Sequence, residues 1–172
     1  MSTEQDSPQF SEQDHHFMRM AIELAQRAEA EGEVPVGAVL VKQGEVIAQG
    51  WNQSIGEHDA TAHAEMQTLR KAGQVLQNYR LLDTTLYVTL EPCPMCAGAL
   101  LHSRVKRIVF GARDLKAGAA GTVLNLFEHQ AAYHYADVEP GLLEDECRAQ
   151  LQSFFKRRRK EQKARKAEKK GE

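Results

Sequence analysis

The sequence predicts an α/β fold in which helices cover a central mixed β-sheet. Short runs of β-branched and aliphatic residues alternate along the chain with segments of helical periodicity. The first two runs are close enough to pair as a hairpin, whereas the later runs are separated by helices of about ten residues, typical of crossovers between parallel strands. The 172 residues, 42% of them hydrophobic, suit one domain with a sizeable core.

A helix and a hairpin are expected first. Residues 14–30 place apolar side chains on one stripe at helical spacing, with Asp14 as the expected N-cap and Gly32 as the stop. Residues 36–41 and 45–51 are rich in β-branched and aliphatic side chains and are separated by a short turn, the pattern of a β-hairpin.

The remaining elements alternate between helices and strands. We expect a helix over residues 63–72 that ends at Gly73, followed by a buried strand over 85–90. A second helix over 94–103 and a second buried strand over 107–112 follow. Residues 111–122 contain several glycines without apolar periodicity, which predicts a loop of the kind that often carries chemistry at strand ends. A short strand is expected near 135–139, and a last helix from about Leu142 into the basic C-terminus.

Charge is distributed unevenly along the chain. Residues 156–170 contain ten Lys or Arg and two Glu, which leaves 12 basic and 22 acidic residues elsewhere, although the net charge is only −2. No apolar run approaches the roughly 20 residues of a membrane span, and the N-terminus lacks the apolar segment of a signal peptide. We therefore expect a cytoplasmic protein without membrane contact, whose three cysteines form no disulfide framework.

Two cysteines are spaced for joint chemistry. Cys93 and Cys96 follow a strand end, and Pro92 and Pro94 fix the entry to the next helix. Both sulfurs can lie on one side of the first helical turn, where the helix N-terminus favours thiolates. Buried structural cysteines and a redox pair are the alternatives to a metal clamp. A thioredoxin-like pair lacks the preceding Trp and the expected order of elements.

His63 completes a candidate metal site. One imidazole and the two cysteines, Cys93 and Cys96, supply three protein ligands, the number found in catalytic zinc sites that keep a fourth position for water. Ligand softness favours zinc, with iron left open. Bound zinc lowers the pKa of water from about 15.7 to near 7.

Glu65 follows His63 by two residues. On a regular helix the two side chains would point about 200° apart, so they are not a matched pair of ligands. In an irregular first turn Glu65 would instead reach the water as a general acid and base. The alternative is an ordinary first-turn carboxylate favoured by the helix dipole.

These residues carry a family resemblance. "HAE" at 63–65 and "PCPMC" at 92–96 resemble the signature of the zinc nucleoside and nucleobase deaminases, whose mechanism is established. Roughly residues 14–159 resemble the bacterial tRNA-specific adenosine deaminases. The resemblance implies a three-layer α/β/α cytidine-deaminase-like fold and a homodimer with one Zn²⁺ per subunit. It also implies hydrolytic deamination of adenosine to inosine at the wobble position of an arginine tRNA. A flexible segment, 1–13, and a basic tail, 160–172, lie outside the pattern.

The resemblance also implies substrate contacts. It assigns the Asn52 amide to the purine and the Arg113–Asp114 pair to the pocket entrance. It places Pro35 and Val36 in the pocket wall and gives Ala64 a contact through its backbone. The residues it assigns to the RNA-binding final helix are Phe154, Phe155, Arg158 and Arg159. Three of these assignments have alternatives. Asn52 would be a turn residue, Arg113 and Asp114 would form a surface ion pair, and at least one phenylalanine would pack on the core.

Two other functions fit parts of the sequence. A deaminase of free cytosine, guanine or a nucleoside would share the zinc site and would not need the basic C-terminus. A noncatalytic RNA-binding protein with structural zinc would need a fourth ligand from His58 or His102 and would leave Glu65 without a role.

Overall fold

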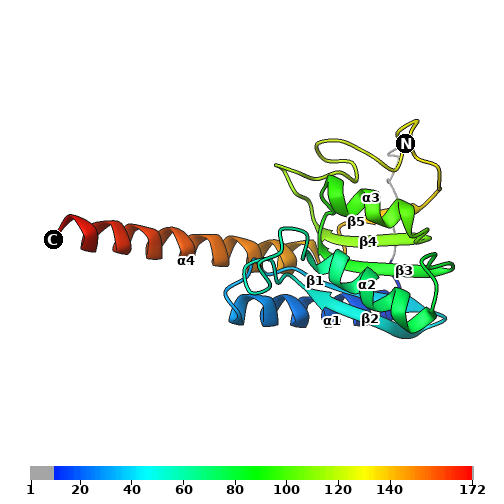
Figure 1. Cartoon of the computed structure of the whole chain (residues 1–172), viewed down its shortest axis with the longest axis horizontal. Helices are drawn as coiled ribbons and strands as arrows, with labels where there is room; N and C mark the ends of the chain where they lie inside the picture. Colours follow the sequence, from blue (N-terminus) through cyan, green and yellow to red (C-terminus); the bar gives the residue numbers. More distant parts are fainter. Residues whose placement is uncertain (1–9, 172) are drawn as a thin grey trace, which may run out of the picture.

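The computed structural model describes residues 10–171, which form a five-stranded mixed sheet with helices on both faces (Figure 1). The strands lie in the order β2-β1-β3-β4-β5 and comprise β1 Gly37–Lys42, β2 Glu45–Trp51, β3 Thr84–Leu90, β4 Arg107–Ala112 and β5 Asp137–Pro140. The helices are α1 Glu12–Ala30, α2 Ala64–Leu76, α3 Pro94–His102 and α4 Glu144–Lys170.

The pairing of the strands confirms the predicted mixed sheet. β1 runs antiparallel to β2 and β3, while β3, β4 and β5 are parallel. Gln43 and Gly44 join the hairpin and have φ angles of 52° and 78°, the left-handed values that a tight hairpin turn requires. α3 forms the crossover between the parallel strands β3 and β4.

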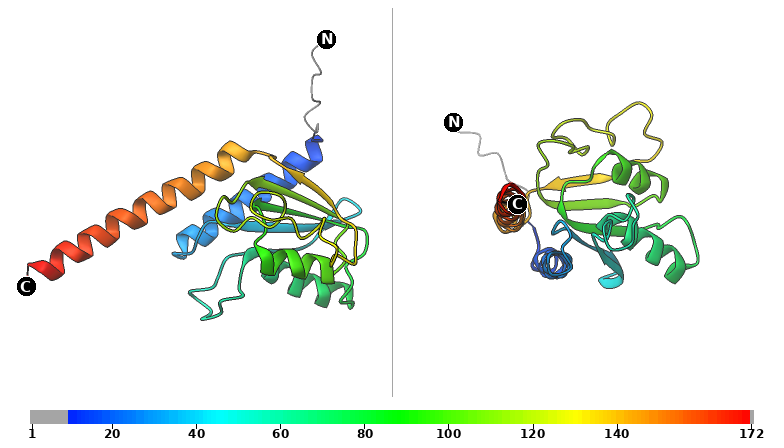
Figure 2. Two further views of the ribbon diagram at one scale, coloured as in Figure 1. Left: turned by 90° about the horizontal axis from the view of Figure 1, so that it is seen from above. Right: turned by 60° about the vertical axis from the view of Figure 1, so that its left-hand side comes forward.

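Alternating side chains divide the core between the two faces of the sheet. Leu40, Leu86 and Ile108 belong to the apolar cluster that contains residues of α2 and α3. Their strand neighbours Val39 and Val109 belong to the cluster that contains residues of α1 and α4. Figure 2 shows the two pairs of helices on opposite sides of the sheet. The three-layer α/β/α arrangement follows from this two-residue alternation.

The first helix begins earlier than the sequence predicts. Ser11 is the N-cap, and its hydroxyl accepts a hydrogen bond from the Asp14 N–H at 3.0 Å, while the Asp14 carboxylate accepts from the Ser11 N–H at 3.1 Å. This reciprocal capping box makes Asp14 the third helical residue, so its prediction as the N-cap was wrong. Phe10 packs against the cluster of α1 and α4, which places residues 10–13 in the folded domain rather than in a flexible segment. Residues 1–9 lie outside the described residues.

Two helices extend beyond their predicted ends. α2 passes through Gly73 and ends where Gln77 adopts the left-handed conformation and donates its N–H to the Gly73 carbonyl. The stop at Gly73 was therefore wrong. α4 continues through residues 160–170, which were expected as a separate tail, because this segment is rich in the helix formers Lys, Arg, Ala, Gln and Glu. Across residues 10–171, no helix combines the length and apolar character that crossing a membrane requires.

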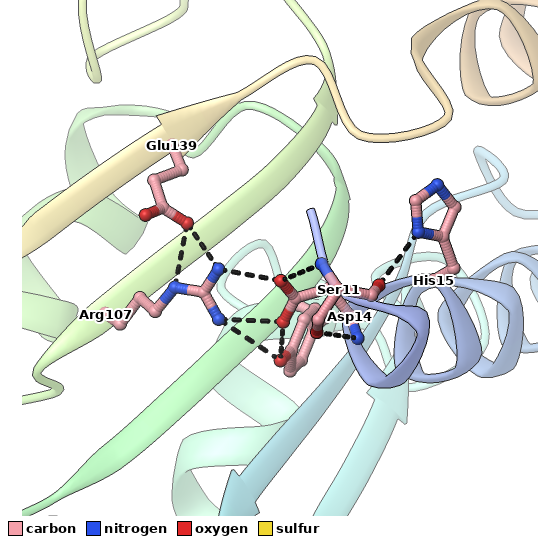
Figure 3. Close-up of polar contacts among 6 residues, drawn as sticks. Ser11, Asp14, His15, Arg107 and Glu139 are labelled. Atoms are coloured by element: carbon pink, nitrogen blue, oxygen red, sulfur yellow. Dashed lines mark hydrogen bonds and ion pairs between the residues drawn. The ribbon is translucent and has the colours of Figure 1, made fainter. Parts of the chain in front are cut away.

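A partly buried ion pair ties α1 to the sheet (Figure 3). The Arg107 guanidinium, at the start of β4, donates to the two Asp14 carboxylate oxygens at 2.8 and 3.0 Å and to Glu139 of β5 at 2.8 Å. The Tyr87 hydroxyl of β3 donates to Asp14 at 2.7 Å. The hydrogen bond from Arg107 holds the pKa of Asp14 well below its usual range, although burial acts in the opposite direction.

We predict that Asp14→Asn lowers the free energy of unfolding by about 2 kcal/mol at neutral pH, because Arg107 keeps only Glu139 as its charged partner. The lowered folded-state pKa makes the contribution complete above the unfolded-state pKa of about 4, and the contribution is lost as the pH falls through the folded-state value. Urea unfolding of both proteins at neutral and acidic pH measures this difference.

The matched control is Asp145→Asn on α4, whose side chain is 97% exposed, for which we expect a change below about 0.5 kcal/mol. An Asp14→Asn destabilisation that stays constant as the pH falls would attribute the effect to packing instead of charge.

Candidate active site

The N-termini of α2 and α3 bring the three predicted metal ligands together. His63 is the N-cap of α2, Cys93 is the N-cap of α3, and Cys96 lies in the first turn of α3. Both sulfurs lie 3.6 Å from His63 Nδ1, and the ligand atoms of all three residues lie within 4.8 Å of one another. Sequence spacing predicted which three residues form the cluster. That they meet at one point depends on the fold, which brings the N-termini of α2 and α3 together.

The donor set and its spacing fit zinc. With Zn–N near 2.1 Å and Zn–S near 2.3 Å, tetrahedral geometry separates a nitrogen and a sulfur ligand by about 3.6 Å, the separation found here. Within residues 10–171, no fourth His, Cys, Asp or Glu joins the cluster. His102 instead packs edge-on against Tyr133, and His58 is exposed. The structural-zinc alternative therefore lacks its fourth ligand.

Without a metal, the two cysteines share a proton. The hydrogen bond with Cys96 lowers the pKa of Cys93 to about 4, whereas the same contact raises the pKa of Cys96. The hydrogen bond with Cys93 raises the pKa of His63. One thiolate therefore forms readily beside an imidazole, and a metal ion would displace the remaining protons because metal ligands must be deprotonated.

Glu65 faces the same cavity as His63 and Cys93. His63 has extended backbone angles, φ −73° and ψ 157°, so it precedes the helix and the 200° separation of a regular helix does not apply. The Glu65 side chain is 4% exposed, and this burial raises its pKa to about 7. A carboxyl group with such a pKa can exchange protons near neutral pH.

A cavity of about 670 Å³ opens above these residues. Six of the predicted substrate-binding residues line it: Val36, Asn52, Arg113, Asp114, Phe155 and Arg159. The Asn52 side-chain oxygen accepts the Ala64 N–H at 2.8 Å, which turns the NH₂ group of the amide toward the remaining space. Ala64 thus contributes by orienting Asn52 and is itself fully buried.

Besides Ala64, three predicted contact residues lie away from the cavity lining. Pro35 is buried at the entry to β1. Phe154 is 3% exposed and packs into the domain, and the Arg158 guanidinium donates to the Gly32 carbonyl at the end of α1. Phe154 and Arg158 therefore anchor α4, and the burial of Phe154 agrees with the alternative of a phenylalanine packed on the core. The contact of Arg158 with RNA stays a prediction.

Glu91 was not predicted, although it directly precedes the Pro-Cys motif. It is 2% exposed, and its carboxylate accepts the N–H groups of Ala120 and Asp114 at 3.0 and 3.2 Å. It also accepts the N–H and the hydroxyl of Thr122. A Cβ atom at Gly118 would clash with a Glu91 oxygen and would lie 2.5 Å from the backbone carbonyl oxygen of Asp114, so glycine is required there. An acidic residue at the end of a buried strand was the available signal.

The contacts of Glu91 hold the loop of residues 113–122 at the mouth of the cavity. Arg113 and Asp114 of this loop line the cavity, together with Leu115 and Lys116. Glu91 also donates its own N–H to the Ala112 carbonyl at 2.9 Å. One carboxylate therefore connects the residues before the metal ligands to the entrance loop.

We predict that Glu91→Gln loosens this loop, because an amide presents a donor where the carboxylate accepts several N–H groups, a cost of about 1 to 3 kcal/mol. Trypsin should cleave faster after the exposed residues Arg113 and Lys116, with the fragments identified by mass spectrometry. Glu128→Gln, an exposed site, is the control. Equal cleavage of all three proteins would show that Glu91 does not hold the loop.

Comparisons with known proteins agree with this site. Residues 11–112 match the family described as the cytidine and deoxycytidylate deaminase zinc-binding region. The tRNA-specific adenosine deaminase of Haemophilus influenzae is 54% identical over 158 residues, which cover 91% of each chain. The protein of the same name from Bacillus subtilis is 50% identical over 152 residues, covering 88% of this chain and 94% of its own.

Solved structures share the fold. One, from a study of A-to-I editing by tRNA:A34 deaminases at the wobble position of transfer RNA, is 43% identical with a TM-score of 0.78, covering 79% of this chain and 99% of its own. A guanine deaminase from Nitrosomonas europaea is 27% identical with a TM-score of 0.72, covering 81% and 83%. The chain therefore belongs to the cytidine and deoxycytidylate deaminase family, among the relatives of the tRNA-specific adenosine deaminases.

Proposed function

We propose that this chain deaminates adenosine to inosine at the wobble position of a tRNA, with an arginine tRNA as the substrate that the sequence resemblance implies. The observation that carries the proposal is that Phe155 and Arg159 of α4 line the same cavity as His63 and Glu65. Metal ligands and a proton carrier lie at one end of this cavity, and an aromatic side chain and cations lie at its mouth. The names of the relatives support the same reaction.

His63, Cys93 and Cys96 would hold one zinc ion per subunit. When bound, zinc supplies a Lewis acid and lowers the pKa of a coordinated water to near 7. The side chain of Glu65 lies outside this ligand cluster and lines the cavity, so it stays available for proton transfer.

Glu65 would move the protons of the reaction. It takes a proton from the attacking water and delivers it to N1 of the adenine as the water oxygen bonds to C6. Glu65 would then take the remaining proton from the hydroxyl on C6 and pass it to the amino nitrogen as the C6–N6 bond breaks. Ammonia leaves, and C6 keeps the oxygen as the carbonyl of inosine. The buried position of Glu65 keeps bulk water from competing for these protons.

The walls of the cavity would select and orient the base. The Asn52 oxygen is engaged by the Ala64 N–H, so its NH₂ group is the part that can donate to a ring acceptor of a purine. Val36 supplies an apolar wall on the β1 side. A base in this cavity must have left its stack, which is easiest in a single-stranded loop.

The mouth of the cavity favours an RNA substrate over a free base. Arg113 and Arg159 place guanidinium groups there, and Phe155 is 44% exposed. Arg148 also lines the cavity but pairs with Glu144 and Asp145. Guanidinium groups bind phosphates, and exposed aromatic rings stack on unpaired bases. A free guanine or cytosine offers no phosphate to these groups. As part of the proposal, the enzyme acts on tRNA in the cytoplasm.

The direct test incubates the metal-loaded protein with an anticodon stem-loop of an arginine tRNA and, separately, with free adenosine, cytidine and guanine. We expect inosine from the RNA and negligible product from the free compounds. Glu65→Ala should retain stoichiometric zinc and the far-UV spectrum but lose at least about a thousandfold in rate, because only the proton carrier is removed. Xanthine or uridine from the free compounds without inosine from RNA would overturn the proposal.

We also propose that the protein acts as a homodimer, as the sequence resemblance implies. A groove between α2 and α3 is lined in part by the apolar side chains of Met66 and Leu69 and by Tyr79, which is 74% exposed. Apolar surface of this kind commonly marks a protein interface. We predict that Tyr79→Glu shifts the protein to monomer in sedimentation equilibrium, whereas Tyr135→Glu, at a residue that is 78% exposed elsewhere, does not. A wild-type monomer would refute this part of the proposal.

A further inference from the structure

The final helix continues well past the cavity. Figure 1 shows the C-terminal part of α4 projecting away from the layered domain. Every residue from 159 to 170 is exposed, and the helix remains regular to Lys170. The first turns of α4 are held against the domain by buried Cys147 and Phe154. The exposed part is therefore a fixed extension of a packed helix.

The face of α4 that lines the cavity continues along this extension. Arg148, Gln152, Phe155 and Arg159 of α4 line the cavity and follow one another at intervals of four, three and four residues. The same intervals after Arg159 lead to Lys163, Lys166 and Lys170, which lie within about 60° of the direction of Arg148 around the helix axis. Cations thus continue the cavity-facing stripe without an interruption by acidic residues.

The acidic residues of the extension lie on the opposite face. Glu161 and Glu168 are about 140° and 160° from the direction of Arg148 around the axis. Arg157, on the same far face, pairs with Glu29 of α1 at 3.4 Å and with Glu161 at 3.6 Å. The far face is therefore directed toward α1 and is electrostatically neutralised, whereas the cavity-facing stripe keeps its positive charge.

We propose that the basic stripe formed by Lys163, Lys166 and Lys170 binds the phosphate backbone of the double-stranded stem whose loop delivers the target base to the cavity. The inference rests on the proposed RNA substrate and identifies a second region of that RNA. From Arg159 to Lys170 the stripe is about 16 Å long, with cations about one helical turn apart. Double-stranded RNA is bound mainly through its shape and its phosphates, which suits a straight row of lysines.

Diffuse attraction between a basic tail and RNA is the competing explanation. It depends on the number of charges removed and is indifferent to their position around the helix. The chain offers a matched pair of double variants that separates the two. Lys166→Gln with Lys170→Gln removes two charges from the stripe, whereas Lys160→Gln with Arg165→Gln removes two charges from positions about 100° or more away. Gln preserves helix propensity in both variants.

The experiment measures dissociation constants and single-turnover deamination with an anticodon stem-loop, and with the same loop closed by a shortened stem. For the full stem, the stripe variant should bind about tenfold more weakly, and the slope of log K against log salt should become shallower by about 1.8. The control variant should change binding less than about twofold. On the shortened stem all three proteins should bind alike, and the maximal deamination rate should be unchanged throughout.

Equal losses of affinity in the two double variants would overturn the proposed binding by the stripe and leave diffuse attraction. A weaker affinity of the stripe variant that persists on the shortened stem would have the same meaning. Full binding by the stripe variant on the full stem would overturn any role for these lysines. Failure of the proposed function would appear differently, because the wild-type protein would then form no inosine from either RNA.

Discussion

The meeting of two helix N-termini at one edge of the sheet is the constraint on which the candidate site depends. α2 and α3 begin with His63 and Cys93 as N-caps, so the ligands occupy positions where backbone N–H groups lack helical partners. The partial positive charge there favours thiolates and therefore metal binding. Because an N-cap residue has extended backbone angles, His63 and Glu65 can serve one cavity although they are two residues apart.

Polar interactions at the two ends of the parallel strands have different consequences. At the start of β4, Arg107 binds both Asp14 and Glu139, which fixes α1 against the sheet. At the opposite end, Glu91 uses its carboxylate to hold a loop, and the side chains of Arg113 and Asp114 remain at the cavity. Paired charge stabilises the architecture in the first case, and a buried carboxylate shapes an entrance in the second.

The last helix links the cavity to the surrounding solvent. Phe154 and Arg158 anchor it, while Phe155 and Arg159, each the next residue in the chain, line the cavity. Adjacent residues on a helix point about 100° apart, so the same short segment can both pack and contact a ligand. The rigid attachment gives the exposed lysines beyond Arg159 a defined direction relative to the cavity.

The sequence by itself determined the order and type of the elements, the mixed sheet, and the set of His63, Glu65, Cys93 and Cys96, because periodicity and ligand spacing are local properties. The predicted ends of α1 and α2 were wrong, because the Ser11 hydroxyl and the Asp14 carboxylate form a reciprocal cap and Gln77 adopts the left-handed conformation. Only the tertiary structure decided which face of α4 lines the cavity and that Glu91 holds the entrance loop. Those contacts join residues far apart in the chain, and their pairing depends on how the layers pack.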